Sequence, residues 1–205
     1  MPFRSDQTAH NHLLCGLVAL SAFVVDTRAV NASDIDFETL PPPLEDTDFL
    51  YDGAPSADLV ELGRNLFFDP ILSGNRNISC GTCHDPAFGT GDGLALGIGE
   101  GGSGAGPMRH TVQPVTGRVP RNAPALWNIG AREYRSMFHD GRLENFGDED
   151  LNLRIPSNAP LPDGIKSLLA AQAFFPVTSP VEMAGQRGEN TVADGMLAEG
   201  FPAAW

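Results

Sequence analysis

The chain is poor in positive charge. It carries 13 lysine and arginine residues against 26 aspartate and glutamate residues, a formal net charge of −13, and Lys166 is its one lysine. Because contact with nucleic-acid phosphates needs a positive surface, this balance argues against broad nucleic-acid binding and favours basic partners. The 205 residues include 41% hydrophobic residues, 23 glycines and 17 prolines, which suits one globular domain with much loop and excludes collagen-like and coiled-coil proteins.

Long apolar runs are also missing. A comfortable membrane span takes about 20 residues, whereas the run from Leu13 to Val25 has only 13. It follows Arg4 and is followed by small residues near Ala32, an arrangement that predicts an export signal over residues 1–32. A retained membrane anchor is the alternative. We therefore expect a periplasmic protein with no stable membrane span once the signal is cleaved.

Cysteine is scarce, and two of the three cysteines are informative. Cys15 lies within the expected signal, so the mature chain would keep Cys80 and Cys83, in an oxidising compartment where unprotected thiols seldom persist. With His84 they form C-x-x-C-H, the attachment pattern of c-type haem, in which two thiols bind the vinyl groups and the imidazole ligates the iron. A zinc site would need two more soft ligands, and a thioredoxin-like redox pair would need a βαβ setting. We therefore predict one covalent haem c with His84 as the proximal iron ligand.

Strand alternation is absent, whereas helical periodicity recurs. Residues 33–55 are acidic and proline-rich, which predicts an extended arm before a folded domain over residues 56–205. Ser56 suits the cap of a helix that ends at Asp69-Pro70. Its apolar residues at helical spacing are expected to bury one face; they are Leu59, Leu62, Leu66 and Phe67.

Two more segments, residues 163–174 and 190–199, have helical patterns, and Gly200 is a plausible stop for the second. Residues 86–121 contain ten glycines and predict a long loop. The expected fold class is therefore mostly α, a helical domain with long loops folded around a haem.

Further haem contacts follow from residue type. Four arginines after the long loop are candidates to pair with the haem propionates, with solvated surface charge as the alternative; they are Arg121, Arg132, Arg135 and Arg142. A sixth iron ligand would decide between electron transfer and peroxide chemistry, because a strong permanent ligand blocks substrate. His110 in the long loop is the possible distal ligand, and a surface or packing role is expected for Met108.

Five segments resemble, in the same order, the bacterial di-haem cytochrome c peroxidases and their MauG-type relatives, over most of residues 61–185. The segments are ELGRNLFFDPILS at residues 61–73, ISCGTCHD at 78–85, PRNAPAL at 120–126, MFHDGR at 137–142, and Gln172, Pro176 and PVEM at 180–183. The resemblance implies a cytochrome c-like domain corresponding to the N-terminal, peroxidatic half of such an enzyme.

The resemblance also implies a reaction and its residues. Hydrogen peroxide would be reduced to water with electrons from a small cytochrome or cupredoxin, whose surface would be basic given the charge of −13. Glu182 would be the general acid–base that moves a proton between the peroxide oxygens, and Gln172 would orient peroxide and a pocket water. Asn122 resembles a residue that supplies a side-chain oxygen to a calcium ion.

Three departures from the family pattern stand out. His139 occupies a position where many relatives have a tryptophan between the haems. Residues 144–170 separate the Asp-Gly-Arg motif from Gln172, a longer spacing than in the shortest relatives. A second C-x-x-C-H is absent, and the chain stops at Trp205 where relatives continue into a second haem domain, so we expect a fragment. A mono-haem electron carrier and a MauG-like oxidase acting on a partner protein are the alternative functions.

Overall fold

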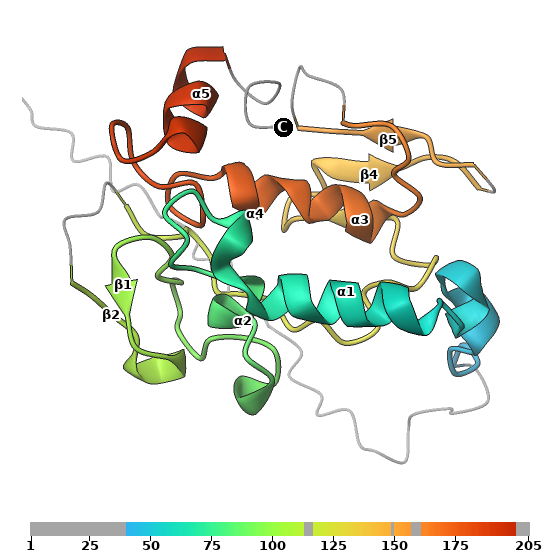
Figure 1. The fold of residues 1–205 in the computed structure, drawn as a ribbon. Coiled ribbons are helices and arrows are strands. Elements are labelled where there is room, and N and C mark those ends of the chain that lie inside the picture. The colour runs from blue at the N-terminus through green and yellow to red at the C-terminus, as the bar shows by residue number, and fades with distance from the viewer. Residues whose placement is uncertain (1–39, 113–116, 149, 157–160, 200–205) are drawn as a thin grey trace, which may run out of the picture. The chain divides into compact units, whose positions relative to one another are not determined.

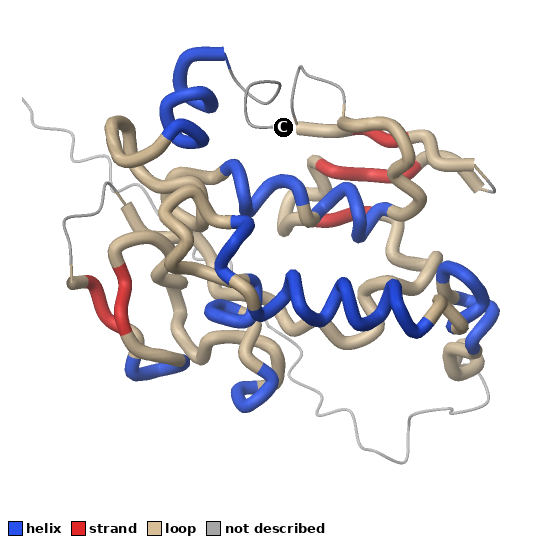
Figure 2. Tube along the Cα trace, viewed as in Figure 1, coloured by secondary structure: helices blue, strands red, loops and turns tan. Residues whose placement is uncertain are grey.

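The computed structural model describes residues 40–112, 117–148, 150–156 and 161–199. The expected export signal, the first part of the expected arm and Gly200 lie outside these residues. The chain divides into two compact units, Met1–Pro42 and Pro43–Trp205, and every element named below belongs to the second. In that unit short helices and shorter strands are joined by long loops (Figure 2).

The unit contains five α-helices and five short 3-10 helices within the described residues (Figure 1). The α-helices are α1 (Ala57–Phe68), α2 (Cys80–Cys83), α3 (Leu168–Gln172), α4 (Phe174–Thr178) and α5 (Thr191–Glu199). The 3-10 helices are η3 (Asp46–Asp48), η4 (Leu50–Gly53), η5 (Pro70–Leu72), η6 (Pro86–Phe88) and η7 (Gly106–Met108). Among the described helices, none is both long and apolar enough to cross a membrane.

The ends of α1 are those that the sequence predicts. The Ser56 hydroxyl accepts a hydrogen bond from the Leu59 N–H at 3.3 Å, and Asp69 ends the helix before Pro70. The predicted helix over residues 190–199 is confirmed by α5. The helix expected over residues 163–174 is shorter, because Ser167 is the N-cap of α3 and accepts from the Ala170 N–H at 3.0 Å.

Part of the expected arm is folded instead of extended. The 3-10 helices η3 and η4 occupy residues 46–53. Arg132, far along the chain, donates its main-chain N–H to the Asp48 carbonyl at 2.8 Å and its guanidinium to the Phe49 carbonyl at 3.2 Å. These bonds tie residues 46–53 to the domain that follows.

Two small antiparallel sheets correct the expectation of a domain without strands. The first pairs β1 (Gly102–Ser103) with β2 (His110–Thr111), and the second has the order β3 (Ser136–Met137), β4 (Leu143–Asn145), β5 (Leu153–Arg154). Each strand has only two or three residues, too few for alternation to be visible in the sequence. Helices and small sheets together make the unit less purely α-helical than expected.

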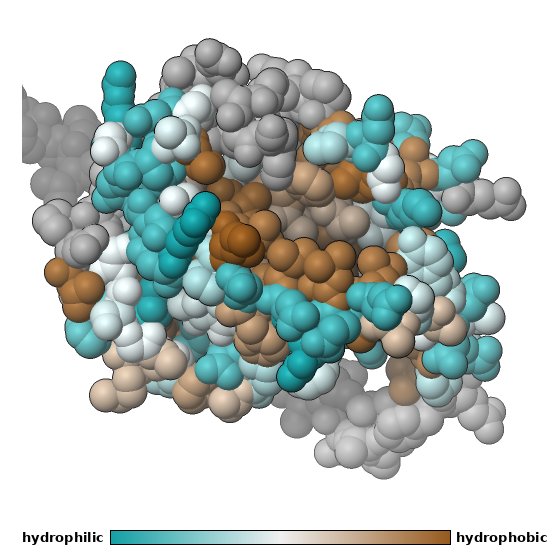
Figure 3. Space-filling model, in the orientation of Figure 1, coloured by the Kyte–Doolittle hydropathy of each residue, from teal (hydrophilic) through white to brown (hydrophobic). Residues whose placement is uncertain are grey.

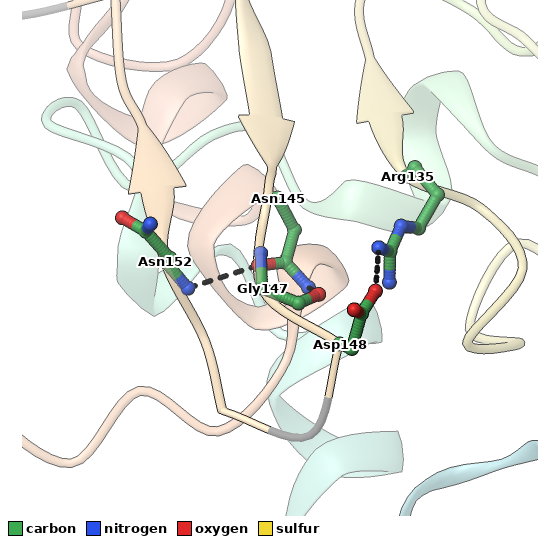
Figure 4. Close-up of polar contacts among 5 residues, drawn as sticks. All are labelled: Arg135, Asn145, Gly147, Asp148 and Asn152. Carbon is green, nitrogen blue, oxygen red and sulfur yellow. Dashed lines mark hydrogen bonds and ion pairs between the residues drawn. The ribbon is translucent and has the colours of Figure 1, made fainter.

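Polar contacts hold the turn between β4 and β5 (Figure 4). The Asn145 side-chain oxygen accepts from the N–H groups of Gly147 at 3.1 Å and Asn152 at 2.9 Å. Arg135, next to β3, forms an ion pair with Asp148 at 2.6 Å. The three-stranded sheet is therefore fixed at its turn by side chains as well as by its ladder.

The apolar core lies where α3 packs on β3 and β4. Leu143 of β4 and Ala171 of α3 are completely buried, and Leu168 is nearly so. Phe138 and Phe175 add an edge-to-face pair with ring centroids 5.4 Å apart. This side of the unit is a protein core built from its own residues.

Candidate haem site

The two cysteines of the C-x-x-C-H motif lie at the ends of the single turn α2. Ser79 begins the turn, and its N–H donates to the Thr82 hydroxyl at 3.0 Å. At the other end the His84 N–H donates to the Cys80 carbonyl at 2.9 Å. Cys80 and Cys83 are half-buried and are not joined by a disulfide. The turn therefore presents both thiols and the histidine from one short, hydrogen-bonded segment.

The ring of His84 is oriented by two backbone carbonyls. Its Nδ1 lies 3.0 Å from the Thr90 oxygen and 3.1 Å from the Pro124 oxygen. Carbonyl oxygens only accept hydrogen bonds, so Nδ1 carries the proton and the lone pair is on Nε2. Metal-bound histidines typically donate their other ring N–H in this way. The donor set of this turn thus fits a haem iron at Nε2.

The apolar face of α1 also fits a haem. The expectation that this helix buries a face holds only in part for the chain by itself. Leu59 is 47% exposed and Leu62 55%, whereas Leu66 and Phe67 are half-buried, and α1 has no fully buried residue. Figure 3 shows apolar side chains gathered in a hollow on the face where α1, α3 and α4 are seen in Figure 1. A large exposed apolar surface indicates a binding site, and a haem supplies apolar area to cover it.

The pKa values of the two thiols depend on burial and on nearby charges, one of which is the expected pocket residue Glu182. Burial raises the pKa of the Cys80 thiol, and it raises the pKa of the Cys83 thiol to about 11. The Arg109 guanidinium opposes the shift at Cys83, whereas the carboxylates of Asp92 and Glu182 add to it. The Glu182 carboxylate therefore lies within electrostatic range of Cys83, although the two residues are far apart in the sequence.

Gln172, the other expected pocket residue, has an unpaired atom. It is the last residue of α3, and its Oε1 is buried without a hydrogen-bond partner among the described residues. A buried amide oxygen without a donor is uncommon in folded proteins. Water or a small substrate with an O–H group would satisfy it.

The remaining candidates are exposed. Arg142 is paired with Asp140 at 3.1 Å and lies over the Phe138 ring, and Arg121 is exposed. His110 is exposed, with Nδ1 3.1 Å from the Met108 carbonyl. Their roles at the haem stay predictions.

Asn122 is the candidate for calcium. It is exposed, and its amide donates to the neighbouring Ala123 carbonyl at 3.5 Å. Within the described part of the chain, no group of three or more histidine, cysteine or acidic residues could hold a metal ion. A calcium site at Asn122 also stays a prediction.

Three buried charged residues near the motif were missed by sequence analysis. Arg109 is 7% exposed, Glu100 4% and Asp92 1%. All three lie in the glycine-rich segment that was expected to be only a long loop. Their residue types give no sign of burial, because charged residues in a loop ordinarily face solvent.

Comparison with known proteins decides the family. The family model described as "Di-haem cytochrome c peroxidase" matches residues 57–199, well over half of the chain. The chain belongs to the di-haem cytochrome c peroxidase family. The match covers α1, the haem-attachment turn, both sheets and α3 to α5 of this family member. Membership agrees with the haem c predicted from the C-x-x-C-H motif.

Individual relatives include peroxidases and MauG proteins. This peroxidase-family chain is 37% identical over 131 residues to cytochrome-c peroxidase IdrP2 of Denitromonas iodatirespirans. The aligned residues are 64% of this chain and 29% of that protein. It is 32% identical over 125 residues to the methylamine utilization protein MauG of Methylorubrum extorquens. These residues are 60% of this chain and 24% of that protein. For cytochrome c551 peroxidase of Pseudomonas aeruginosa the identity is 34% over 89 residues, which are 43% of this chain and 21% of that protein. The chain thus spans less than a third of the length of these relatives.

Proposed function

We propose that this unit is a haem c domain that reduces hydrogen peroxide to water. The observation that carries the proposal is the hydrogen-bonded turn Cys80–Cys83 followed by His84, whose Nδ1 is held by two carbonyls, in a chain that the peroxidase family model matches over residues 57–199. Peroxide cleavage also needs an acid–base, and the resemblance to the family assigns that role to Glu182.

Cys80, Cys83 and His84 would hold the haem. The cysteine sulfurs would attach it covalently, and His84 would ligate the iron through Nε2, because its Nδ1 is held by the Thr90 and Pro124 carbonyls. When bound, the haem supplies the iron at which peroxide binds and through which electrons pass. The apolar side chains of α1 would cover it and exclude water.

Glu182 and Gln172 would handle the proton and the substrate. The Glu182 carboxylate takes a proton from one peroxide oxygen and returns it to the other as the O–O bond breaks, so that this oxygen leaves as water. Two electrons from a donor protein and two protons from solvent complete the conversion of one peroxide into two waters. The unpaired Oε1 of Gln172 accepts a hydrogen bond from peroxide or from a pocket water.

The net charge of the chain indicates what kind of protein would donate the electrons. With a net charge of −13, the chain attracts a small basic cytochrome or cupredoxin. Such docking weakens at high ionic strength, because salt screens exposed charges over about 10 Å at 0.1 M. Residues 1–32 would direct the chain to the periplasm, where such donors operate, and Asn122 would offer an amide oxygen to calcium.

A second candidate is oxidation of a partner protein. The similarity to MauG of Methylorubrum extorquens favours it, because MauG proteins belong to the same family as the peroxidases. The same Glu182 and Gln172 would serve both reactions.

Replacing the Glu182 carboxylate tests the proposal. For the haem-loaded chain, matured in a host that attaches haem c, we expect Glu182→Gln to slow single-turnover peroxide consumption by roughly 100-fold or more. Covalent haem content should stay unchanged. Glu133→Gln, at an exposed glutamate, is the matched control and should react like the unsubstituted chain. A Glu182→Gln rate within twofold of that of the unsubstituted chain would refute the acid–base role.

A further inference from the structure

Arg109 is a buried cation bonded to the main chain. Its Nε donates to the Ile98 carbonyl at 2.6 Å, one terminal nitrogen to Gly99 at 2.8 Å and the other to Gly104 at 3.0 Å. Among the described residues no carboxylate lies within ion-pair distance of it. A buried guanidinium that uses its donors on three carbonyls fixes the path of the loop that carries them.

The peptide that Arg109 holds is pressed against the backbone of Glu182. A Cβ placed on Gly99 would lie 2.2 Å from the Val181 oxygen, 2.5 Å from the Glu182 oxygen and 2.6 Å from the Glu182 Cα. Contacts this short leave room for glycine alone. Gly99 therefore packs directly against the main chain of residues 181 and 182.

The rest of the Glu182 segment is already fixed. The Ser179 carbonyl accepts from the N–H groups of residues 182, 183 and 184 at 3.0 to 3.1 Å. From another part of the chain, the Gly74 N–H donates to the Met183 carbonyl at 2.9 Å. Residues 179–184 thus form a tight turn, and the Gly99 peptide packs against it at the proposed acid–base.

The charge of Arg109 also belongs to the haem site. Burial lowers the pKa of its guanidinium, and the nearby groups of Cys83, Glu100 and Asp92 oppose that shift. Arg109 nonetheless stays protonated, because an arginine is effectively always charged. Arg109 is thus bonded to the 98–104 loop, and its charge lies within electrostatic range of Cys83.

We propose that Arg109 is a positioning residue that holds the Gly99 peptide and thereby sets where the Glu182 carboxylate stands. This inference rests on the proposed acid–base role of Glu182. Lysine would keep the charge but not the planar set of donors, so it cannot hold all three carbonyls in the same geometry.

Two readouts in the haem-loaded chain test the proposal. We expect Arg109→Lys to leave haem content and the resting absorption spectrum unchanged and to slow single-turnover peroxide consumption about tenfold, since small misplacements of a reacting group are costly. Amide hydrogen exchange at residues 182–184 should become about tenfold faster, because the turn loses its support. The matched control is Arg118→Lys, since the exposed Arg118 guanidinium donates to the Leu96 carbonyl near the same loop.

A double variant separates positioning from general destabilisation. If Arg109 acts through Glu182, Arg109→Lys should cause no further loss of rate in the Glu182→Gln background. The proposal would be overturned if Arg109→Lys lowered the rate of peroxide consumption equally with and without Glu182→Gln. It would also be overturned if amide hydrogen exchange at residues 182–184 were unchanged. If Glu182→Gln alone reacts normally, the proposed function fails, and the exchange measurement alone decides whether Arg109 supports this turn.

A second variant tests the same proposal in case Arg109→Lys does not fold or does not attach haem. A Cβ on Gly102 would lie 2.8 Å from one Arg109 nitrogen and 2.9 Å from its Cζ. Gly102→Ala therefore displaces the guanidinium while keeping its charge. It should reproduce the faster exchange and the slower peroxide reaction, and normal values of both would contradict the inference.

Discussion

Helices α1 and α3 are both apolar on one side, yet only α3 is buried. Leu168 and Ala171 of α3 pack against Leu143 in the core, whereas α1 has no buried residue. The partner of α3 is the sheet of β3 and β4, made by the chain itself. Among the described residues, α1 packs against the α2 turn, where Phe67 and Phe68 lie against Gly81. Leu59 and Leu62 of α1 stay exposed. The difference teaches that one part of this unit is packed by its own chain, whereas much of the apolar face of α1 is left for a bound group to cover.

The largest expected effect comes from removing the haem. Cys80→Ala with Cys83→Ala should abolish haem that survives a denaturing gel, because both thioether bonds are lost. In hydrogen exchange, α1 should then lose protection while residues 168–178 keep theirs, since only α3 and α4 lie at a protein core. Equal protection of α1 with and without haem would contradict the comparison.

Two leucine-to-alanine substitutions, one in the core and one on α1, sharpen the comparison between these two regions. Leu143→Ala removes a fully buried side chain and should lower the free energy of unfolding by about 2–5 kcal/mol with or without haem. Leu62 is 55% exposed in the chain, so Leu62→Ala should cost less than about 0.5 kcal/mol without haem. With haem bound, the cost of the Leu62 change should rise by roughly 1 kcal/mol or more, because the side chain is then covered.

Denaturant unfolding of both variants measures these costs. The decisive quantity is the difference between the haem-free and haem-loaded chains, and not either value alone. A Leu62→Ala cost that is the same in both forms would mean that α1 does not cover the haem.

The last expected effect is a dependence on alkaline pH. The pKa of Cys83 is raised from its ordinary 9.0 to about 11, so the folded chain holds the thiol proton more tightly than the unfolded chain. Stability from this group is complete below pH 9 and is lost as pH rises to about 11, on the order of 1–2 kcal/mol. Cys83→Ser should remove this loss, and so should haem attachment, because a thioether does not titrate. Unfolding midpoints of the haem-free chain from pH 8 to 11 provide the measurement.

Sequence predicted the features that depend on neighbouring residues. The helix α1 begins at Ser56 and ends before Pro70 because capping and proline act locally. The C-x-x-C-H motif needs only five consecutive residues to be read. Burial of Leu59 and Leu62 in α1 was predicted wrongly for the chain by itself, because an apolar stripe shows that a partner exists without showing that the partner belongs to the chain.

The parts that sequence missed depend on distant contacts. The strands of both sheets are too short for a periodic pattern, and their pairing is set by the tertiary fold. Arg109 could not be found because its partners are the carbonyls of Ile98, Gly99 and Gly104, and every residue has a carbonyl. The charge of Arg109 gave no hint, since an arginine in a glycine-rich loop is ordinarily solvated.

The double contact of the His84 ring has a consequence for biosynthesis. The Pro124 carbonyl lies 40 residues beyond the histidine whose Nδ1 it contacts. A nascent chain that has emerged only as far as the C-x-x-C-H motif can offer its two thiols for attachment, but it cannot yet hold the imidazole as the finished domain does. Alignment of the imidazole by both carbonyls therefore requires that residue 124 has been synthesised and has folded back onto the motif, whereas the two thiols need no such contact.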